Sequence, residues 1–319
     1  MSNGTGRTAA VCNRRFPIAH TFSIVARDPE TGEMGVAVQS HWFSTGSLVT
    51  WAESGVGAIA TQSMVEVSYG PLGLDLMRSG KSSEESLKML LAGDEGRDLR
   101  QVAMVDKNGC VATHTGKRCI TEAGHITGDG FSVQANMMLY PTVWPAMAEV
   151  YKTTSGNLID RLLAALTAAQ SAGGDIRGQQ SAAILVVKGQ ATGKPWEDRI
   201  IDLRVEDHLA PIDELKRLVG VQRAYQLMNK GDDMLGKSQV TEALEAYKNA
   251  AAMLPEMLEL PFWQAVTLAD LGKMDEALPI FKDVFSKEPN WALLLQRLPA
   301  AGLIKDDAEL LRRILEMAK

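Results

Sequence analysis

Residues 21–28 have the sequence TFSIVARD, and the fold can be inferred outward from this segment. Apolar and polar side chains alternate along most of it, which is the two-residue period of a β-strand. The turn sequence PETGE follows at residues 29–33, and MGVAVQS at residues 34–40 then predicts a second strand that pairs with the first. Because the first strand opens on Thr21, we expect this hydroxyl where the strand emerges, at an edge of the sheet.

The composition limits the classes of protein that fit. The chain has 319 residues, 45% of them hydrophobic and 23% charged, which is comfortable for two globular domains. A net charge of −6 and a pI near 5.5 argue against a surface that binds nucleic acid or anionic membranes. No apolar run approaches the roughly 18 residues of a membrane span, and residues 1–20 lack the apolar core of a secretory signal. We therefore expect a cytoplasmic protein that binds neither nucleic acid nor membranes.

Ligand-type side chains occur together at Cys110, His114, Cys119 and His125. Their spacing matches no paired Cys-x-x-Cys zinc pattern, so we expect no metal and no cofactor. The three cysteines are an odd number in a chain too large to need disulfides, which predicts reduced thiols. A disulfide between Cys110 and Cys119, across neighbouring strands, is the disfavoured alternative.

Strands and helices occur in blocks up to residue 210. Strands are predicted at residues 21–28, 33–40, 56–61, 101–106, 110–114, 132–138, 181–187 and 199–205, and helices at 71–79, from Ser82 onward, at 141–151 and at 158–166. This order is not the regular strand–helix alternation of a doubly wound parallel sheet. We predict an α+β domain at residues 21–210, with two antiparallel sheets stacked face to face and helices outside each, the four-layer αββα arrangement.

Two local signals within this domain are specific. Ser82 and Glu85 have the spacing of a capping box, which starts a helix. Asn108 and Gly109 separate two strand segments, and this dipeptide is typical of a type I′ hairpin turn.

From Pro211 onward the strand pattern stops and residues 211–319 are predicted to be all helical. A set of four residues recurs thirty-four positions further along: Ala243, Tyr247, Ala250 and Pro255 become Ala277, Phe281, Val284 and Pro289. This period, with an aromatic residue four after a small one and a closing proline, resembles the tetratricopeptide repeat. We expect the segments 212–229 and 307–318 to cap the two copies.

Several motifs carry a resemblance to a known family. They are the sequence that starts at Thr21, Gly35-Val-Ala-Val-Gln-Ser, Gly55-Val-Gly-Ala, Ala60-Thr-Gln, Tyr69-Gly-Pro-Leu-Gly-Leu, Gln134-Ala-Asn-Met, Ala172-Gly-Gly-Asp-Ile-Arg-Gly-Gln-Gln-Ser-Ala-Ala and Asp202-Leu-Arg-Val-Glu-Asp-His. In this order they are similar to a bacterial family, domain of unknown function 1028, over residues 21–218. That family looks like a branch of the N-terminal-nucleophile (Ntn) hydrolases.

The resemblance implies that Thr21 is both nucleophile and base. In Ntn hydrolases the first residue of the mature chain attacks an amide carbonyl, and its own α-amine takes the hydroxyl proton. A hydroxyl is a poor nucleophile until a base removes its proton, and an α-amine with a pKa of about 8 is partly deprotonated near neutral pH. The alternative is that Thr21 is an ordinary β-branched strand residue.

Residues 1–20 precede this threonine, so its amine is free only after the bond between His20 and Thr21 is cut, or if the chain is started at Thr21 after an initiator methionine. We interpret residues 1–20 as a disordered leader or propeptide. His20 differs from the glycine that usually precedes the nucleophile of self-processing Ntn precursors.

Further site residues are predicted from their chemistry and their motif positions. Asn136 is a candidate oxyanion donor, because a side-chain amide suits acyl transfer. Asp175 and Arg177 stand in a glycine-rich loop, where they bind the charged ends of a substrate or brace the turn as an internal pair. Ser40 and Gln62 stand near strand ends and are candidates to line a substrate pocket.

The sequence therefore leaves two functions open. The first is an Ntn-type amidohydrolase that cleaves an amide bond in a small or peptide-like substrate after exposure of Thr21. The second is a catalytically inactive hydrolase-like scaffold whose helical residues 211–319 bind a protein partner or mediate self-association.

Overall fold

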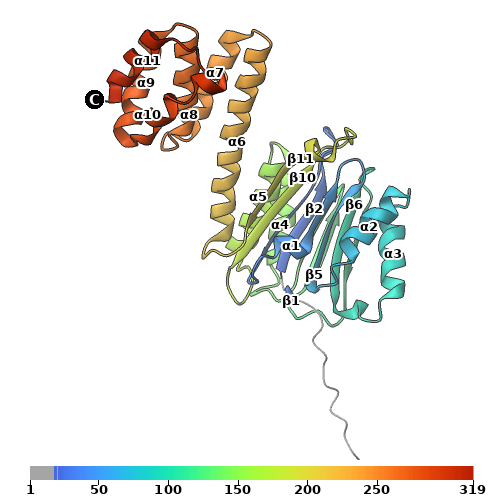
Figure 1. Ribbon diagram of the computed structural model, residues 1–319. Coiled ribbons are helices and arrows are strands. Elements are labelled where there is room, and N and C mark those ends of the chain that lie inside the picture. Colours follow the sequence, from blue (N-terminus) through green and yellow to red (C-terminus); the bar gives the residue numbers. More distant parts are fainter. Residues whose placement is uncertain (1–17, 20, 319) are drawn as a thin grey trace, which may run out of the picture. The chain divides into compact units, whose positions relative to one another are not determined.

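The computed structural model describes residues 18–19 and 21–318, and the chain divides into two compact units on either side of Lys216 and Arg217 (Figure 1). The first unit is mixed α/β with antiparallel sheets, and the second is helical. Both features confirm the sequence prediction at this level.

The first sheet has six strands, and β2 (Thr21–Arg27) lies in its interior. Its order is β11 (Arg199–Val205), β10 (Ser181–Val187), β3 (Met34–Ser40), β2, β9 (Phe131–Ala135) and β8 (Gly124–Gly128), with every neighbouring pair antiparallel. As the sequence predicts, β2 pairs with β3, with Thr21 opposite Ser40. The turn between them is closed by Asp28, whose Oδ1 accepts hydrogen bonds from the amides of Glu30 and Thr31.

The second sheet has five strands arranged around β5 (Gly57–Met64). The others are β1 (Ile18–Ala19), β4 (Thr50–Glu53), β6 (Arg100–Asp106) and β7 (Val111–Thr115). On one side β5 pairs with β6. On the other side β4 pairs with residues 57–60 of β5, and β1 pairs with Ser63 and Met64.

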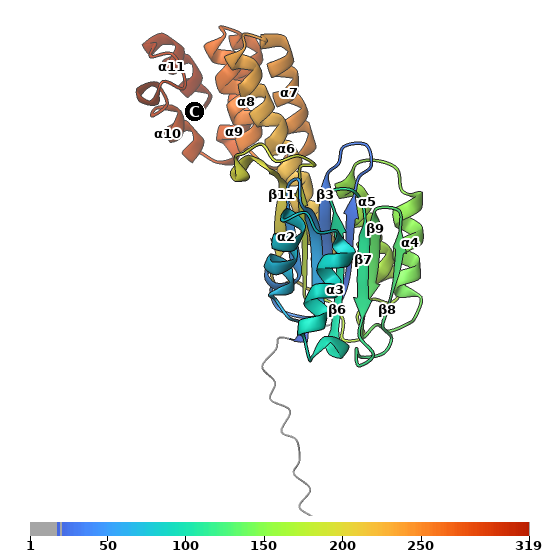
Figure 2. The same ribbon diagram turned by 90° about the vertical axis from the view of Figure 1, so that its right-hand side faces the viewer.

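The two sheets face each other through an apolar layer. It includes Val25, Val36 and Val38 from the first sheet and Ala60 and Val105 from the second. Helices α4 (Val143–Thr153) and α5 (Leu158–Ser171) cover the outer face of the six-stranded sheet, and α2 (Tyr69–Arg78) and α3 (Ser83–Gly93) cover the outer face of the other (Figures 1 and 2). Short helical turns complete the unit: α1 (Gly46–Val49), η1 (Arg97–Leu99) and η2 (Pro195–Glu197).

The two local signals have different outcomes. The capping box is confirmed, because Ser82 Oγ accepts from the Glu85 amide at 3.2 Å and Glu85 Oε2 accepts from the Ser82 amide at 2.9 Å. The predicted hairpin of β6 and β7 is also present, but the prediction that its turn is of type I′ is wrong. Gly109 has a φ of 87°, whereas Asn108 does not have the positive φ that this turn requires.

A carboxylate organises that loop instead. Asp106 Oδ1 accepts hydrogen bonds from the amides of Asn108 at 2.9 Å and Cys110 at 3.1 Å. These bonds hold the loop with only Gly109 in the left-handed region. Cys110 and Cys119 are free thiols, as the sequence predicts.

The second unit consists of consecutive helices. They are α6 (Pro211–Gly236, which begins in the first unit), α7 (Val240–Met253), α8 (Glu259–Asp270), α9 (Met274–Lys287), α10 (Asn290–Leu295) and α11 (Ala308–Leu315), with 3-10 turns η3 (Pro299–Ala301) and η4 (Glu316–Ala318). In the core of this unit, the rings of Phe262 and Phe281 pack edge to face with their centroids 6.0 Å apart. Ile314 of α11 is buried in the same apolar cluster. Along the described parts of both units, no helix has the length and apolar character that a membrane crossing requires.

A buried arginine holds the end of β5. Arg100 is 2% exposed, and its Nη1 donates to the Met64 carbonyl at 2.6 Å while its Nε donates to Asp94 Oδ2 at 2.8 Å. Burial alone would raise the pKa of Asp94, but the hydrogen bonds from Arg100 and from the Gly96 amide outweigh it and lower that pKa below its ordinary value. The ion pair therefore stabilises the fold when the carboxyl is ionised.

Replacement of Asp94 by Asn tests this ion pair. The variant removes the nearer carboxylate from the buried guanidinium and leaves only the more distant Glu66, at 3.9 Å, among its described acidic contacts, so we expect a loss of about 2–3 kcal/mol in the free energy of unfolding at pH 7. The pKa of Asp94 is lower in the folded than in the unfolded chain. The difference in the free energy of unfolding between wild type and variant is therefore fully present above the unfolded pKa of about 3.9, and it shrinks as the pH falls through the native pKa. Urea unfolding at pH 7 and at pH 3 measures both effects, and equal stabilities at pH 7 would contradict this role of Asp94.

Candidate active site

A row of polar residues crosses one end of the six-stranded sheet. Ser181 of β10 lies opposite Ser40 of β3, and Ser40 lies opposite Thr21 of β2. Asn136 follows β9 directly, and its backbone amide donates to the Thr21 carbonyl at 3.1 Å. All four residues are fully buried. The structure thus brings three of the predicted site residues, Thr21, Ser40 and Asn136, into one row.

This row faces the second sheet. Alternate residues of a strand point to the same face, so Thr21 shares its face with Ser23 and Val25. Ser23 Oγ donates to Gln62 Oε1 on β5 at 2.6 Å, and Val25 belongs to the apolar layer between the sheets. The Thr21 side chain is therefore directed between the two sheets rather than toward the covering helices.

A network of buried amides surrounds the main chain of Thr21. Its carbonyl accepts hydrogen bonds from Gln62 Nε2 at 3.2 Å and Asn136 Nδ2 at 3.4 Å, besides the Asn136 backbone amide. The same two side-chain nitrogens also donate to Gln101 Oε1, at 2.7 and 2.9 Å. Gln101 Nε2 in turn donates to the Ala135 carbonyl at 2.9 Å. Because both ends of the Gln62 and Gln101 amides have partners and Asn136 Nδ2 donates to this network, the position of the Thr21 main chain is fixed.

Gln101 is a member of this site that the sequence analysis missed. It stands on a strand face that is otherwise apolar, with Ala103 and Val105 directed into the layer between the sheets. Gln62 likewise stands on an otherwise apolar strand face, which it shares with Ala58 and Ala60. A glutamine on an apolar strand face is the signal that would have found Gln101, and Gln62, which the sequence did predict as a site residue, shows the same signal.

Strained backbone flanks the network on both sheets. Met137, directly after Asn136, has a φ of 60°, and Ser63, directly after Gln62, has a φ of 73°. Side-chain-bearing residues in this region cost of order 1–3 kcal/mol and concentrate at functional sites. The prediction of a strand over 132–138 was too long for the same reason, since β9 ends at Ala135, before the strained residue.

The glycine-rich loop also reaches this end of the sheet. The Ile176 amide donates to the Met137 carbonyl at 3.2 Å, and the His41 amide donates to Asp175 Oδ2 at 3.4 Å. Asp175 accepts two further bonds from the Arg177 side chain, Nε to Oδ1 at 3.0 Å and Nη2 to Oδ2 at 2.7 Å. The Asp175 side chain is fully buried and that of Arg177 is 27% exposed. This geometry matches the internal pair that braces the turn, and it places both residues beside the row.

The described residues before Thr21 belong to the other sheet. Ile18 pairs with Met64 and Ala19 with Ser63, so the chain passes from the five-stranded to the six-stranded sheet between Ala19 and Thr21. The prediction that residues 1–20 form a disordered leader lies outside the described residues, except at these two positions, which form β1.

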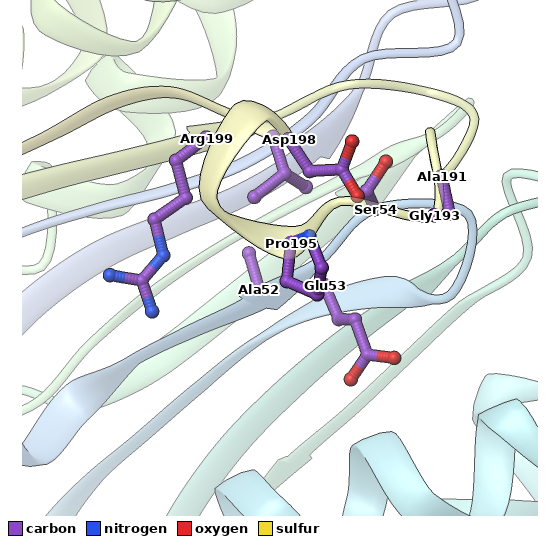
Figure 3. A pocket seen from close by; sticks show the side chains of 9 residues that line it. Ala52, Glu53, Ser54, Ala191, Gly193, Pro195, Asp198 and Arg199 are labelled. Atoms are coloured by element: carbon purple, nitrogen blue, oxygen red, sulfur yellow. The ribbon is translucent and has the colours of Figure 1, made fainter.

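A separate pocket of about 430 Å³ lies at the opposite end of β10 (Figure 3). It is lined by Ala52, Glu53, Ser54, Val187, Ala191, Gly193, Pro195, Asp198 and Arg199. Its charged groups have protein partners: Glu53 pairs with Arg78, and Arg199 pairs with Asp202 at 2.8 Å. The side chains of Glu53 and Arg199 also diverge (Figure 3), so they do not converge on a ligand. Within residues 18–19 and 21–318, no three His, Cys, Asp or Glu side chains are grouped to hold a metal ion.

Fold and site together define a two-sheet α/β protein with a polar cluster at the start of an interior strand. The chain belongs to DUF1028, a family of unknown function, whose family model matches residues 21–215. It is similar to the crystal structure of a DUF1028 protein from Silicibacter pomeroyi, with 32% identity, a TM-score of 0.57, and coverage of 63% of this chain and 84% of that one. No curated protein matches the chain. The resemblance to this family in the sequence is thereby confirmed.

The amide network predicts a specific stability effect. Gln101→Leu removes the acceptor for two buried side-chain amides, so we expect a loss of about 2–4 kcal/mol in the free energy of unfolding. Gln180→Leu is the matched control, because the only described contact of the Gln180 side-chain amide is an exposed hydrogen bond to Asp207, and a change below about 0.5 kcal/mol is expected there. Urea unfolding of both variants checks this, and a loss in Gln101→Leu no larger than that expected of the control would contradict a stabilising role of the network.

Proposed function

We propose that this chain is an Ntn-type amidohydrolase in which Thr21, after removal of residues 1–20, is the nucleophile and carries the catalytic base on its α-amine. The observation that carries the proposal is the position of Thr21. It is the first residue of an interior strand and the first residue of the family match, and its carbonyl is held by Asn136 and Gln62. A residue that acts through both its hydroxyl and its amine needs such a fixed main chain.

The arrangement of layers supports the same class of enzyme. Two stacked antiparallel sheets with a helix pair outside each are the αββα order of Ntn hydrolases. The side chain of Thr21 is directed between the sheets, beside Ser40. We infer the Ntn-hydrolase fold from this combination.

The proposed chemistry has two stages. In the first, Thr21 Oγ attacks the carbonyl carbon of His20, the bond from that carbon to the Thr21 nitrogen breaks, and the hydroxyl proton moves to the nitrogen. Water then hydrolyses the ester, which leaves a carboxyl group on His20 and restores the hydroxyl beside a free amine.

In the second stage the same oxygen attacks the amide of a small or peptide-like substrate. The α-amine takes the hydroxyl proton and passes it to the leaving amine, and water hydrolyses the resulting ester. Asn136 is the proposed oxyanion donor, although in the uncleaved chain its amide binds the carbonyl of Thr21 itself. Ser40, Gln62, Asp175 and Arg177 are proposed to line the substrate pocket, with the Asp–Arg pair at its charged end.

The helical unit is the basis of the alternative, an inactive scaffold that binds a protein partner or self-associates through residues 211–319. We propose that α6–α7 and α8–α9 are two tetratricopeptide-like copies. In support, Tyr247 and Phe281 are both buried, and a Cβ at Gly231 would come within 2.7 Å of the Tyr247 ring, as expected where two helices pack closely. The family model ends at residue 215, so this unit is an addition to the family domain.

Variants of Thr21 test the proposed function. The full-length Thr21→Ala chain lacks the attacking hydroxyl, so we expect it to remain uncleaved, whereas Thr21→Ser retains a hydroxyl and is cleaved at a measurable rate. Intact-mass measurements of each purified chain over time provide the readout. Thr45→Ala is the control, because Thr45 is also a buried threonine of the same unit but not part of the row. Cleavage of Thr21→Ala at the wild-type rate would contradict self-processing.

A further inference from the structure

We infer that the edge of β5 at Ser63 and Met64 is a binding site for an extended peptide backbone, occupied by β1 in the uncleaved chain and by the acyl part of a peptide-like substrate afterwards. This inference rests on the proposed function and narrows its substrate class.

Two unrelated segments share this edge of β5. β4 pairs with residues 57–60, and β1 pairs with Ser63 and Met64. β4 belongs to the family domain, whereas β1 lies before Thr21, where the proposed cut separates it from the rest of the chain. Loss of β1 leaves Ser63 and Met64 without a strand on that side, and unpaired strand edges accept extended peptides.

The protein holds this edge in a defined conformation. Ser63 is 1% exposed and has a φ of 73°, which an L-residue rarely adopts. Arg100 pairs with Ser63 from β6, and its guanidinium also binds the Met64 carbonyl. The Asp94 carboxylate fixes that guanidinium in turn. Strain that is maintained by a buried ion pair marks a preorganised site rather than a frayed strand end.

The register of β1 leads directly to the candidate nucleophile. β1 runs antiparallel to β5, with Ile18 opposite Met64 and Ala19 opposite Ser63. A peptide that binds in this register and continues for one more residue reaches the level of Gln62. Gln62 Nε2 lies 3.2 Å from the Thr21 carbonyl. The carbonyl of that third residue is then the one presented to the threonine.

This register defines a chemical class of substrate. Backbone pairing requires two residues on the amino-terminal side of the residue whose amide is cut. It depends weakly on their side chains, because the main chain provides the hydrogen bonds. The site thus selects peptides or N-acylated peptides in extended conformation over simple primary amides.

Peptide binding to a full-length chain with a displaced β1 tests the inference. Ala19→Pro removes the backbone N–H at the pairing position and frees the edge, and Thr21→Ala in the same chain prevents any chemistry. The probe is a fluorescent peptide with the sequence of residues 13–20, NRRFPIAH, ending in a free carboxylate. We expect saturable binding at least tenfold tighter than to the chain with Thr21→Ala alone, and slower hydrogen exchange at the amides of Ser63 and Met64.

The control probe is the same peptide with proline in place of its alanine, which is expected to lose this binding. Ile18→Pro serves as a second variant if Ala19→Pro does not fold, as judged by circular dichroism. The inference would be overturned if the peptide did not bind, or if it bound equally to chains with and without the proline. It would also be overturned if the peptide slowed hydrogen exchange only at amides other than those of Ser63 and Met64. Thr21 is replaced in these chains, so peptide binding to them does not depend on catalysis. If the peptide binds but the wild-type chain does not cleave itself, the proposed catalysis is refuted and the peptide-binding site stands.

Discussion

The structure depends on the way buried amides hold one carbonyl group between two sheets. The Thr21 carbonyl, Gln62, Gln101 and Asn136 are all removed from water, and an unpaired amide in such a layer costs of order 1–3 kcal/mol. Gln62 and Gln101 bond to each other within the five-stranded sheet, and the bonds from Gln62 to the Thr21 carbonyl and from Asn136 to Gln101 cross the interface, so the network links the sheets. A fully satisfied buried network specifies one arrangement, whereas an apolar layer alone permits small slippage. The position of Thr21 is therefore a consequence of how the sheets are joined.

Local patterns, rather than this network, account for what the sequence could predict. Period-two patterns at residues 21–28 and 34–40 identified β2, β3 and their antiparallel pairing, because the patterns agree with the turn sequence at residues 29–33, which Asp28 closes in the structure. The mixed α/β class, the antiparallel sheets and the helical C-terminal unit followed from the order of such segments. The proposed Ntn-hydrolase fold and the repeat character of the helices go beyond this and remain proposals.

The sequence could not supply contacts between strands that are distant in the chain. Gln62 and Gln101 lie 39 residues apart, and neither has a local partner that would reveal the other. The turn after Asp106 was assigned from Asn108 and Gly109, but a carboxylate that accepts two loop amides determined its form. Likewise, β1 has two residues, too few for a periodic signal, and it forms only because β5 offers an edge.

In the proposed mechanism Thr21 acts with a free α-amine, and N-terminal analysis of the mature wild-type protein can detect that amine. Mild periodate cleaves an N-terminal threonine only when its amine is free, and produces an aldehyde that a hydrazide reagent labels. We expect the mature chain to begin at Thr21 and to be labelled after periodate treatment. A mature chain in which the peptide bond between His20 and Thr21 is intact, with no label, would contradict the proposed mechanism.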